Sequence, residues 1–346
     1  MINLYENKKV LITGNTGFKG SWLSIWLMEL GAKVYGYALP CKNKQDNYVK
    51  CNLETKIEQT YGDIRESKFI EVCEKIKPDI IFHLAAQPIV LESYEDPFNT
   101  ITTNIVGTLN FLECVKKISS IKSAINITTD KVYENKEWVW AYRENDRLGG
   151  KDPYSISKAC SEMISFSYMN SFNLKNLATA RAGNVIGGGD WSQHRILPDI
   201  MRAYKNNQTV TIRHPYASRP WQFVLDCLSG YLTLGSSLYS DSKFSGSWNI
   251  GPIDNKNYYV IDLVNILKDK IKINLNIENL NSKKECYSLR LDVSKAINEL
   301  NWKPKLNFET TIDYALSGYL DEFNDEDILG ARINQIKRYN EKSLNI

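Results

Sequence analysis

The chain has 346 residues, 43% of them hydrophobic and 24% charged, and its 43 lysines and arginines nearly balance its 40 aspartates and glutamates. This balance argues against a protein that binds nucleic acid through a strongly basic surface, but it leaves room for a basic pocket for a phosphorylated small molecule. Because the seven cysteines form no C-x-x-C pair and no apolar run approaches the roughly 18 residues of a membrane-spanning helix, we expect a soluble cytoplasmic protein without a metal site.

Short β-branched runs alternate with longer amphipathic segments through the first half of the chain. Helices are predicted at 18–30, around 67–77, at 98–117 and from Pro153 onward. Strands are predicted at 9–13, 33–39, 79–84, 123–128 and 176–182. Such alternation predicts right-handed crossovers and a parallel sheet that is covered on both faces. We therefore expect an α/β fold with a doubly wound, Rossmann-type parallel sheet.

The pattern changes at Gly183, where a glycine-dense segment precedes shorter strands and helices. We expect a Rossmann-like domain over residues 1–182 and a smaller C-terminal substrate lobe over most of 183–346. Segment 221–240 looks helical and is expected to return to the first domain. The charged tail, acidic at 321–327 and mixed beyond, is expected to form a solvated helix or a frayed end.

A G-x-x-G-x-x-G loop follows the first strand and opens the first helix. Glycines let the backbone turn tightly and approach a pyrophosphate at the positive end of the helix. The order of strand, loop and helix is the one that a dinucleotide site requires. The residues that we expect at this cofactor are Gly14, Thr16, Gly17, Phe18, Lys19 and Gly20.

The carboxylate that usually binds the adenosine ribose is missing from the end of the second strand. The next carboxylate is Asp46, and Lys42 and Lys44 lie near it, so the sequence leaves both NAD and NADP open. Asp63 and Ile64 follow a short third strand. The Asp63 carboxylate could accept a hydrogen bond from the adenine amino group or could cap the turn.

Tyr154 and Lys158 form a Y-x-x-x-K pair on a predicted helix, where positions four apart share a face. We expect the lysine ammonium to lower the pKa of the phenol from about 10 toward working pH. The phenolate could then take the proton of a sugar hydroxyl while a hydride leaves to a nicotinamide.

Thr128, Thr129, Asp130 and Lys131 lie at the carboxyl end of a predicted strand, where ligands bind in open α/β sheets. Thr129 could bind a hydroxyl beside Tyr154, Asp130 could donate a proton, and Lys131 adds a second titratable group. In the alternative interpretation, Asp130 caps backbone amides and Lys131 is solvated.

From about residue 9 to residue 316 the chain resembles extended short-chain dehydrogenases/reductases, and within them the CDP-glucose 4,6-dehydratases. The glycine loop and the Tyr-Lys pair specify only the superfamily, whereas GFKGSW, the TDK triplet, EWVWAYREND and GNVIGGGDW point to the dehydratases that act on a CDP-sugar. The segments that carry the resemblance are 13–27, 36–39, 83–88, 103–108, 126–146, 149–158, 181–191 and 219–224.

This resemblance implies a hydro-lyase reaction in which NAD oxidises the sugar at C4, water is eliminated across C5 and C6, and the hydride returns to C6. It implies that Thr129 holds the C4 oxygen and that Asp130 is the acid at C6. Lys131 stands where related dehydratases carry glutamate, and it would be the C5 base if its pKa is depressed. Glu134 is the rival base.

The resemblance also implies further binding residues and partners. It implies NAD as cofactor, CDP-glucose as substrate, a homodimer or higher oligomer paired through helices at 98–117 and 154–170, and a place in deoxysugar synthesis for surface polysaccharide such as lipopolysaccharide O-antigen. Lys284-Glu285 departs from the His-Glu that family members usually carry. The implied cofactor residues are Leu84, Ala85, Ala86, Gln87, Asn104, Thr128, Tyr154 and Lys158, and the implied diphosphate ligands are Asn184, Arg195 and Arg219.

Three other functions remain open. A nucleotide-sugar 4-epimerase shares the C4 ketone but needs no acid at C6, so Asp130 disfavours it. A dehydratase of another nucleotide sugar would share all of these residues. A nucleotide-binding regulator without catalysis is disfavoured by the intact Tyr154, Lys158 and Asp130.

Overall fold

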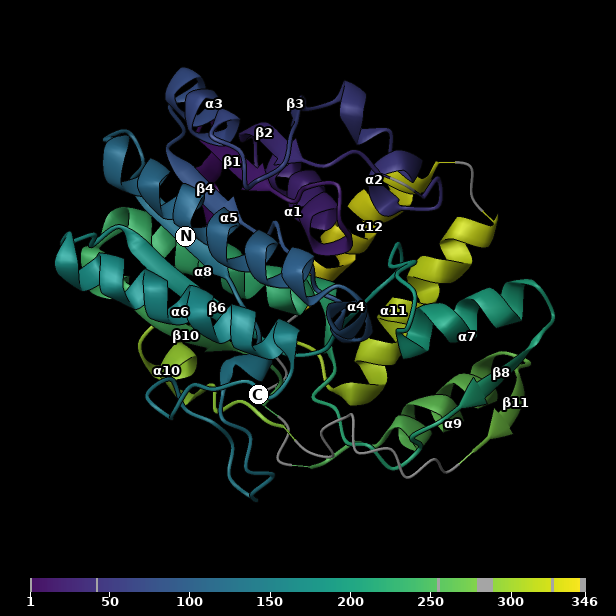
Figure 1. Cartoon of the computed structure of the whole chain (residues 1–346). Coiled ribbons are helices and arrows are strands. Elements are labelled where there is room, and N and C mark those ends of the chain that lie inside the picture. The colour runs from purple at the N-terminus through teal and green to yellow at the C-terminus, as the bar shows by residue number, and fades with distance from the viewer. Residues whose placement is uncertain (1, 42, 254–255, 279–288, 325–326, 343–346) are drawn as a thin grey trace.

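A seven-stranded parallel sheet lies at the centre of the computed structural model (Figure 1), which describes residues 2–41, 43–253, 256–278, 289–324 and 327–342. The strand order is β10-β6-β5-β4-β1-β2-β3, so the order reverses between β1 and β4. The expected doubly wound sheet is confirmed, and ligands of such sheets bind outside the carboxyl ends at this reversal. The strands are β1 (Lys9–Thr13), β2 (Lys33–Ala38), β3 (Glu58–Tyr61), β4 (Ile80–His83), β5 (Ser123–Ile127), β6 (Leu177–Ala182) and β10 (Gly246–Ile250).

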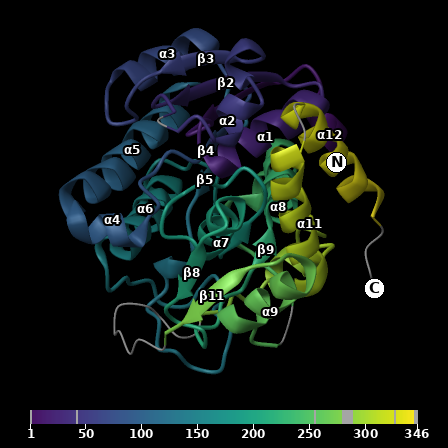
Figure 2. The ribbon, with the colours of Figure 1, turned by 90° about the vertical axis from the view of Figure 1, so that its right-hand side faces the viewer.

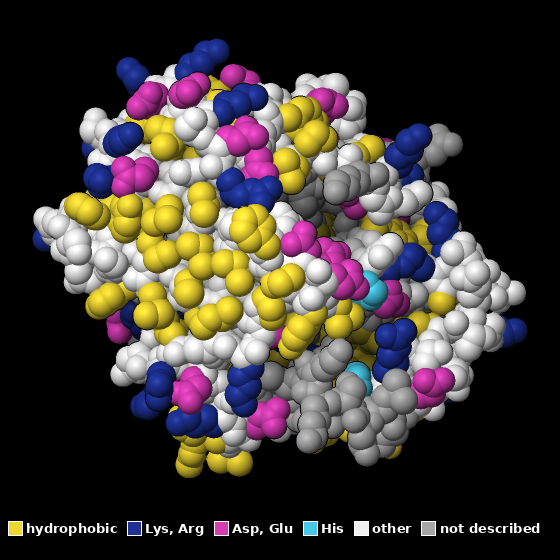
Figure 3. All heavy atoms as spheres, in the orientation of Figure 1, with side chains coloured by type: hydrophobic (Ala, Val, Ile, Leu, Met, Phe, Trp, Pro, Cys, Tyr) yellow, Lys and Arg dark blue, Asp and Glu magenta, His cyan; other side chains and the backbone are white. Residues whose placement is uncertain are grey.

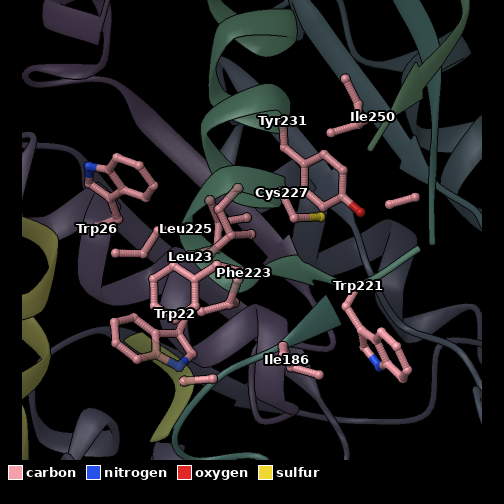
Figure 4. Packing of buried hydrophobic residues seen from close by; sticks show 14 of the residues in the cluster. Trp22, Leu23, Trp26, Ile186, Trp221, Phe223, Leu225, Cys227, Tyr231 and Ile250 are labelled. Atoms are coloured by element: carbon pink, nitrogen blue, oxygen red, sulfur yellow. The ribbon is translucent and has the colours of Figure 1, made fainter. Parts of the chain in front are cut away.

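Helices cover both faces of the sheet, and alternate residues of each strand face opposite layers. Leu11 and Ile81 belong to the core beneath α3 (Lys68–Ile76), α5 (Pro97–Lys117) and α6 (Pro153–Ser171). Val10 and Phe82 belong to the larger core on the other face, beneath α1 (Phe18–Glu29) and α8 (Val224–Ser240). Figure 4 shows Trp22 of α1 close to Phe223, the residue that precedes α8, and to Leu225 in the first turn of α8. Burial on both faces explains why the central strands are apolar throughout.

Helices α5 and α6 begin with the same local signal. Each starts at a proline, which suits the first helical position because its missing N–H needs no partner there. The preceding aspartate caps the helix: Asp96 accepts a hydrogen bond from the Asn99 N–H, and Asp152 accepts one from the Ser155 N–H. The second cap fixes where the helix that carries Tyr154 begins.

The C-terminal half builds a smaller region beside the sheet (Figure 2) and also returns to the sheet itself. Helix α8 packs against β5 and β6, and β10 pairs with β6. The boundary between a domain over 1–182 and a lobe over 183–346 stays a prediction. The elements of the smaller region are β7 (Val185–Ile186) paired with β9 (Gln222–Phe223), β8 (Thr209–Ile212) paired with β11 (Asn274–Ile277), α7 (Ile196–Lys205), α9 (Val260–Lys270), α10 (Ser294–Asn298) and α11 (Phe308–Asn324).

Two expectations for the second half are corrected. Helix α8 begins at Val224, because Gln222 donates its N–H to the Asn184 carbonyl and lies in strand β9. The tail is not solvated: helix α12 (Ile328–Glu341) packs against α1, with the Tyr339 ring edge-on to Trp26 at 5.7 Å between ring centres. Its charge pattern was misleading because Arg332 is fully buried and paired inside the protein.

The remaining elements connect these layers: α2 (Asn47–Lys50), α4 (Val90–Glu95) and the 3-10 helices η1 (Ile2–Tyr5), η2 (Leu53–Thr55), η3 (Asp130–Val132) and η4 (Ser242–Phe244). Six cysteines lie in the described part of the chain, four of them buried. Cys286 and the Lys284-Glu285 pair lie outside the described residues. Within the described ranges, no helix combines the length and apolar character needed to cross a membrane.

Candidate active site

The structure places the expected site residues after the carboxyl ends of the parallel strands and on the helices that follow. The glycine loop lies between β1 and α1, Asp63 and Ile64 follow β3, and segment 84–87 follows β4. The sequence triplet 129–131 follows β5, and Tyr154 and Lys158 lie in the first two turns of α6. Asn184 lies between β6 and β7, Arg195 precedes α7, and Arg219 precedes β9.

The glycine loop is packed so closely at Gly14 and Gly20 that neither position has room for a side chain. Gly14 has a positive φ of 71°, and a Cβ there would lie 2.7 Å from the Ala85 nitrogen. A Cβ on Gly20 would lie 2.3 Å from the Gly14 carbonyl oxygen. The loop therefore brings bare backbone to the N-terminus of α1, which fits a dinucleotide pyrophosphate.

The segment after β4 is fixed by hydrogen bonds to its neighbours. Ala85 donates its N–H to the Thr13 hydroxyl at 3.1 Å, and Gln87 donates its N–H to the Asn104 side-chain oxygen at 2.9 Å. Asn104 also donates to the Ser157 hydroxyl at 2.8 Å. Asn104 is buried, so it holds the expected cofactor wall against α5 and α6.

At the adenosine end, Asp63 forms a turn cap and an ion pair. Its carboxylate accepts the Arg65 N–H at 2.9 Å and lies 2.5 Å from the guanidinium, which holds the pKa of Asp63 below its usual value. The turn-cap interpretation is therefore confirmed, while a contact to adenine stays a prediction. Asp46, the next carboxylate in the chain after the second strand, is half-buried, and burial raises its pKa to about 6.

Thr129, Asp130 and Tyr154 form a buried polar group at the end of β5. The Thr129 hydroxyl donates to the Asp130 carboxylate at 2.9 Å. Burial raises the pKa of Tyr154 to about 12, and a hydrogen bond with Thr129 opposes this rise. All three side chains are at most 7% exposed, so a ligand that reaches them enters a poorly hydrated site.

The structure differs from the expected coupling of Lys158 to the phenol. Lys158 donates from Nζ to the Ile127 carbonyl at 3.0 Å, so its ammonium is held by the backbone of β5. Burial, reinforced by the positive charge of Lys19, lowers the pKa of Lys158 to about 7. Burial also lowers the pKa of Lys19, which donates to the Tyr231 hydroxyl at 3.2 Å. Desolvation thus dominates both the phenol and the amine in the free site.

Asp130 and Lys131 lie side by side on η3 in different environments. Burial raises the pKa of Asp130, an effect opposed by Lys131, Thr129 and Arg219. Lys131 is only half-buried, and its N–H donates to the Thr129 hydroxyl at 3.4 Å. The rival base Glu134 is paired with Arg147 at 3.2 Å. The pair supports a structural role for Glu134.

Two of the expected diphosphate ligands, Arg195 and Arg219, lie close enough to the buried polar group for their charges to act on it. Arg195 pairs with Asp190 at 2.9 Å and is close enough to Tyr154 to affect its pKa. Arg219 donates to the Ser218 carbonyl at 2.9 Å, and its positive charge opposes the rise in the pKa of Asp130. These two arginines therefore face the acid and the phenol from the C-terminal half of the chain.

Sequence reasoning missed a buried ion pair beneath the site. Glu162 and Arg181 lie 2.8 Å apart with side chains at most 3% exposed. Glu162 also accepts a hydrogen bond from the Thr128 hydroxyl, next to the reacting triplet. The available signal was spacing, because Glu162 lies four residues after Lys158 and therefore shares its buried helix face.

Sequence comparisons place this arrangement in a family. A family model described as GDP-mannose 4,6 dehydratase matches residues 11–314. The CDP-glucose 4,6-dehydratase of Salmonella typhimurium is 44% identical over 351 residues, which cover 97% of each chain. The dTDP-D-glucose 4,6-dehydratase of Dictyostelium discoideum is 33% identical over 222 residues, which cover 59% of this chain and 50% of that protein.

Solved structures share the fold. The dTDP-glucose 4,6-dehydratase of Bacillus anthracis in complex with NAD has a TM-score of 0.76 at 23% identity, over 92% of this chain and 98% of that one. The UDP-glucuronic acid 4-epimerase of Bacillus cereus in complex with UDP-glucuronic acid and NAD has a TM-score of 0.79 at 22% identity, over 91% and 99%. Together with the similarity to the Salmonella enzyme, the family match confirms the expected resemblance, and the chain belongs to the GDP-mannose 4,6-dehydratase family.

Proposed function

We propose that this protein is a hydro-lyase that converts CDP-D-glucose into CDP-4-dehydro-6-deoxy-D-glucose with NAD as cofactor. Sequence identity of 44% over nearly the full length of the Salmonella typhimurium CDP-glucose 4,6-dehydratase supports this substrate. The observation that carries the reaction type is the buried Asp130, bonded to Thr129 beside Tyr154. A 4-epimerase has no use for an acid at this place, so Asp130 favours dehydration over epimerisation.

The chain's own residues fit a dinucleotide, and NAD when bound supplies an acceptor that takes the hydride from C4 and returns it to C6. The closely packed Gly14 and Gly20 would hold the pyrophosphate against the start of α1. Glu54 lines a pocket of about 320 Å³ with Cys41 and Tyr61 beyond the end of β2. A carboxylate in this pocket disfavours the 2′-phosphate of NADP, because like charges repel at short range.

Tyr154 and Thr129 would bind the C4 hydroxyl, and the Tyr154 oxygen would take its proton. A buried phenol resists ionisation, so this step needs cations close by. Lys158 lies one turn farther along the same helix, and Arg195 approaches from α7. Each could stabilise the phenolate as it forms.

Elimination then requires an acid at C6 and a base at C5. Asp130 suits the acid, because burial raises its pKa and favours the protonated carboxyl that can give its proton to the departing C6 oxygen. Lys131 would take the C5 proton, so one proton is removed and one is delivered as water leaves. Asn184, Arg195 and Arg219 would bind the diphosphate, for which the fork of a guanidinium is well shaped.

We also propose that the protein works as a homodimer, in the cytoplasm, on a route to surface deoxysugars. Helices α5 and α6 present an apolar face to solvent (Figure 3), where Phe98 is 77% exposed, Phe166 68% and Met163 60%. Isolated proteins seldom expose a contiguous apolar surface of this kind, and a second copy of the same two helices would cover it. Phe166→Glu should shift the molar mass in light scattering toward the monomer. The comparison is Phe172→Glu, at the residue just after the end of α6, which should leave the molar mass unchanged.

The test of function is incubation with CDP-, UDP-, GDP- and dTDP-glucose, each with NAD or NADP, following the 4-keto product by its absorbance in alkali. We expect turnover of CDP-glucose with NAD, and loss of product in Asp130→Asn but not in the exposed-pair variant Asp199→Asn. Deuterium placed on C4 should be recovered in the C6 methyl group. Turnover of only another nucleotide sugar would refute the substrate, and loss of the deuterium to solvent would refute the reaction.

A further inference from the structure

The Asp190 side chain connects the glycine-rich segment 183–191 to an expected substrate ligand. Its carboxylate accepts a hydrogen bond from Arg195 Nη1 at 2.9 Å and one from the Ser192 N–H at 3.1 Å. Asp190 is 2% exposed, whereas about a third (34%) of the Arg195 side chain remains exposed. One partner is therefore fixed in the interior, and the other remains partly exposed to solvent.

The backbone of Asp190 is held by helix α11. The Tyr319 hydroxyl donates to the Asp190 carbonyl at 2.6 Å, and Tyr319 is fully buried. Two residues earlier, Gly188 lies directly on Gly318 of the same helix, where an added Cβ would come within 2.4 Å of the backbone. Segment 183–191 and helix α11 are therefore packed so closely that their backbones can meet in only one arrangement.

The next residue extends this bracing to the C-terminal helix. Trp191 donates from its indole N–H to Glu322 at 2.8 Å, and Glu322 pairs with the fully buried Arg332 of α12. Arg332 also donates to the Gly318 carbonyl at 2.8 Å. The two last helices thus hold Gly188 and Trp191, which lie on either side of Asp190 in the chain, in place.

Arg195 needs such a partner for a physical reason. It is the N-terminal cap residue of α7, where the helix dipole disfavours a cation. The Asp190 carboxylate offsets this and is the main cause of the raised pKa of Arg195. An unpaired arginine would also sample several rotamers, and fixing them on binding costs free energy.

We propose that Asp190 is a positioning residue of this enzyme, which orients Arg195 toward the diphosphate of the nucleotide sugar from a loop braced by α11 and α12. The inference rests on the proposed function, since it takes the diphosphate as the ligand of Arg195. Asp190 itself does not touch the substrate. Its contribution is to present the guanidinium in one orientation before the substrate arrives.

The first test is Asp190→Asn, which keeps the size of the side chain and removes its charge. We expect the Kd of CDP, measured by calorimetry, and the KM of CDP-glucose to rise about tenfold to a hundredfold, the range for losing a charge-assisted contact. The kcat should fall less than the KM rises, because Lys158 still lies beside Tyr154 when Arg195 is misoriented. Asp199→Asn, which removes the surface partner of Arg202 on the same helix, is the matched control and should change neither value.

A double-variant cycle shows whether Asp190 acts through Arg195. Arg195→Gln should weaken CDP binding, and adding Asp190→Asn to it should weaken binding no further, because the guanidinium is already gone. Additive losses would overturn the proposal, and so would an unchanged Kd in either single variant. Because CDP binding is measured without turnover, an inactive wild type would refute the proposed function and leave this readout intact.

A second variant guards against a general loss of structure. Tyr319→Phe removes only the hydroxyl that holds the Asp190 carbonyl, and we expect a rise of about threefold in the Kd of CDP with kcat retained. If Asp190→Asn and Tyr319→Phe lowered kcat and melting temperature but left the Kd unchanged, Asp190 would be structural and the proposal would fail.

Discussion

Lys158→Met should stabilise the cofactor-free protein while it abolishes catalysis. Lys158 is 5% exposed, and burial with the nearby Lys19 charge lowers its pKa from 10.5 to about 7. Methionine has a similar length and no charge, so the variant escapes the cost of burying an ammonium. It forfeits one hydrogen bond to the Ile127 carbonyl, which contributes about 1 kcal/mol.

The size and the sign of the effect follow from linkage between protonation and folding. Between pH 7 and 10.5 the unfolded lysine binds more protons than the folded one, so wild-type stability rises with pH across this window. The cost of burying the amine is about 5 kcal/mol at pH 6 and about 2 kcal/mol at pH 9. Lys158→Met lacks this dependence, so its advantage should shrink by about 3 kcal/mol between the two pH values.

Thermal melting of the cofactor-free proteins measures this difference. For a chain of 346 residues the unfolding entropy corresponds to about 0.7 kcal/mol per degree, so the gap in melting temperature should narrow by about 4 °C between pH 6 and pH 9. The exposed Lys151→Met should follow the wild type at both pH values. Parallel melting curves for wild type and Lys158→Met would show that Lys158 is charged throughout, and the reasoning from burial would be wrong.

Three further variants test the site and its supports. Gly20→Ala places a Cβ 2.3 Å from a loop carbonyl, so NAD affinity should fall at least about tenfold in calorimetry, and unchanged affinity would exclude this loop as the pyrophosphate site. Tyr154→Phe should lower kcat about 10²- to 10⁴-fold with CDP affinity retained, and near-normal turnover would remove Tyr154 from the chemistry. Arg332→Met leaves Glu322 buried without its cation, so the melting temperature should fall by about 4–7 °C, whereas the exposed Arg338→Met should leave it unchanged. An equal fall in the melting temperature of both variants would show that the buried Arg332–Glu322 pair does not contribute more to stability than an exposed arginine does.

Hydrophobic pattern was sufficient to predict the central strands of the sheet, but it did not identify the edge strand β10. Strands buried on both faces must be apolar throughout, and helices between them must carry one apolar face, so periodicity located both. The hydrophobic pattern failed at the C-terminal tail, because a sequence pattern does not distinguish a buried charged residue from an exposed one. Arg332 is fully buried and is paired with Glu322, ten residues earlier on another helix. No local pattern states that two such residues will meet.

The candidate site likewise contains some features that the sequence predicts and others that it does not. Glycine spacing and the Tyr-Lys pair depend on local geometry, and the structure keeps each in its expected element. The partner of Lys158 could not be predicted, because its bond to the Ile127 carbonyl joins a helix to a strand 31 residues away. Asp190 was missed for a related reason: its importance depends on Arg195 and on Tyr319, more than a hundred residues farther along the chain.

The short helix η3 places Asp130 and Lys131, which we propose as acid and base, in different surroundings. A 3-10 helix has about three residues per turn, so consecutive side chains leave its axis about 120° apart. Asp130 consequently points into the buried interior, while its neighbour Lys131 remains half-exposed. In the proposed reaction the carboxyl of Asp130, whose pKa is raised by burial, would deliver a proton to the departing C6 oxygen, and Lys131 would take the proton from C5.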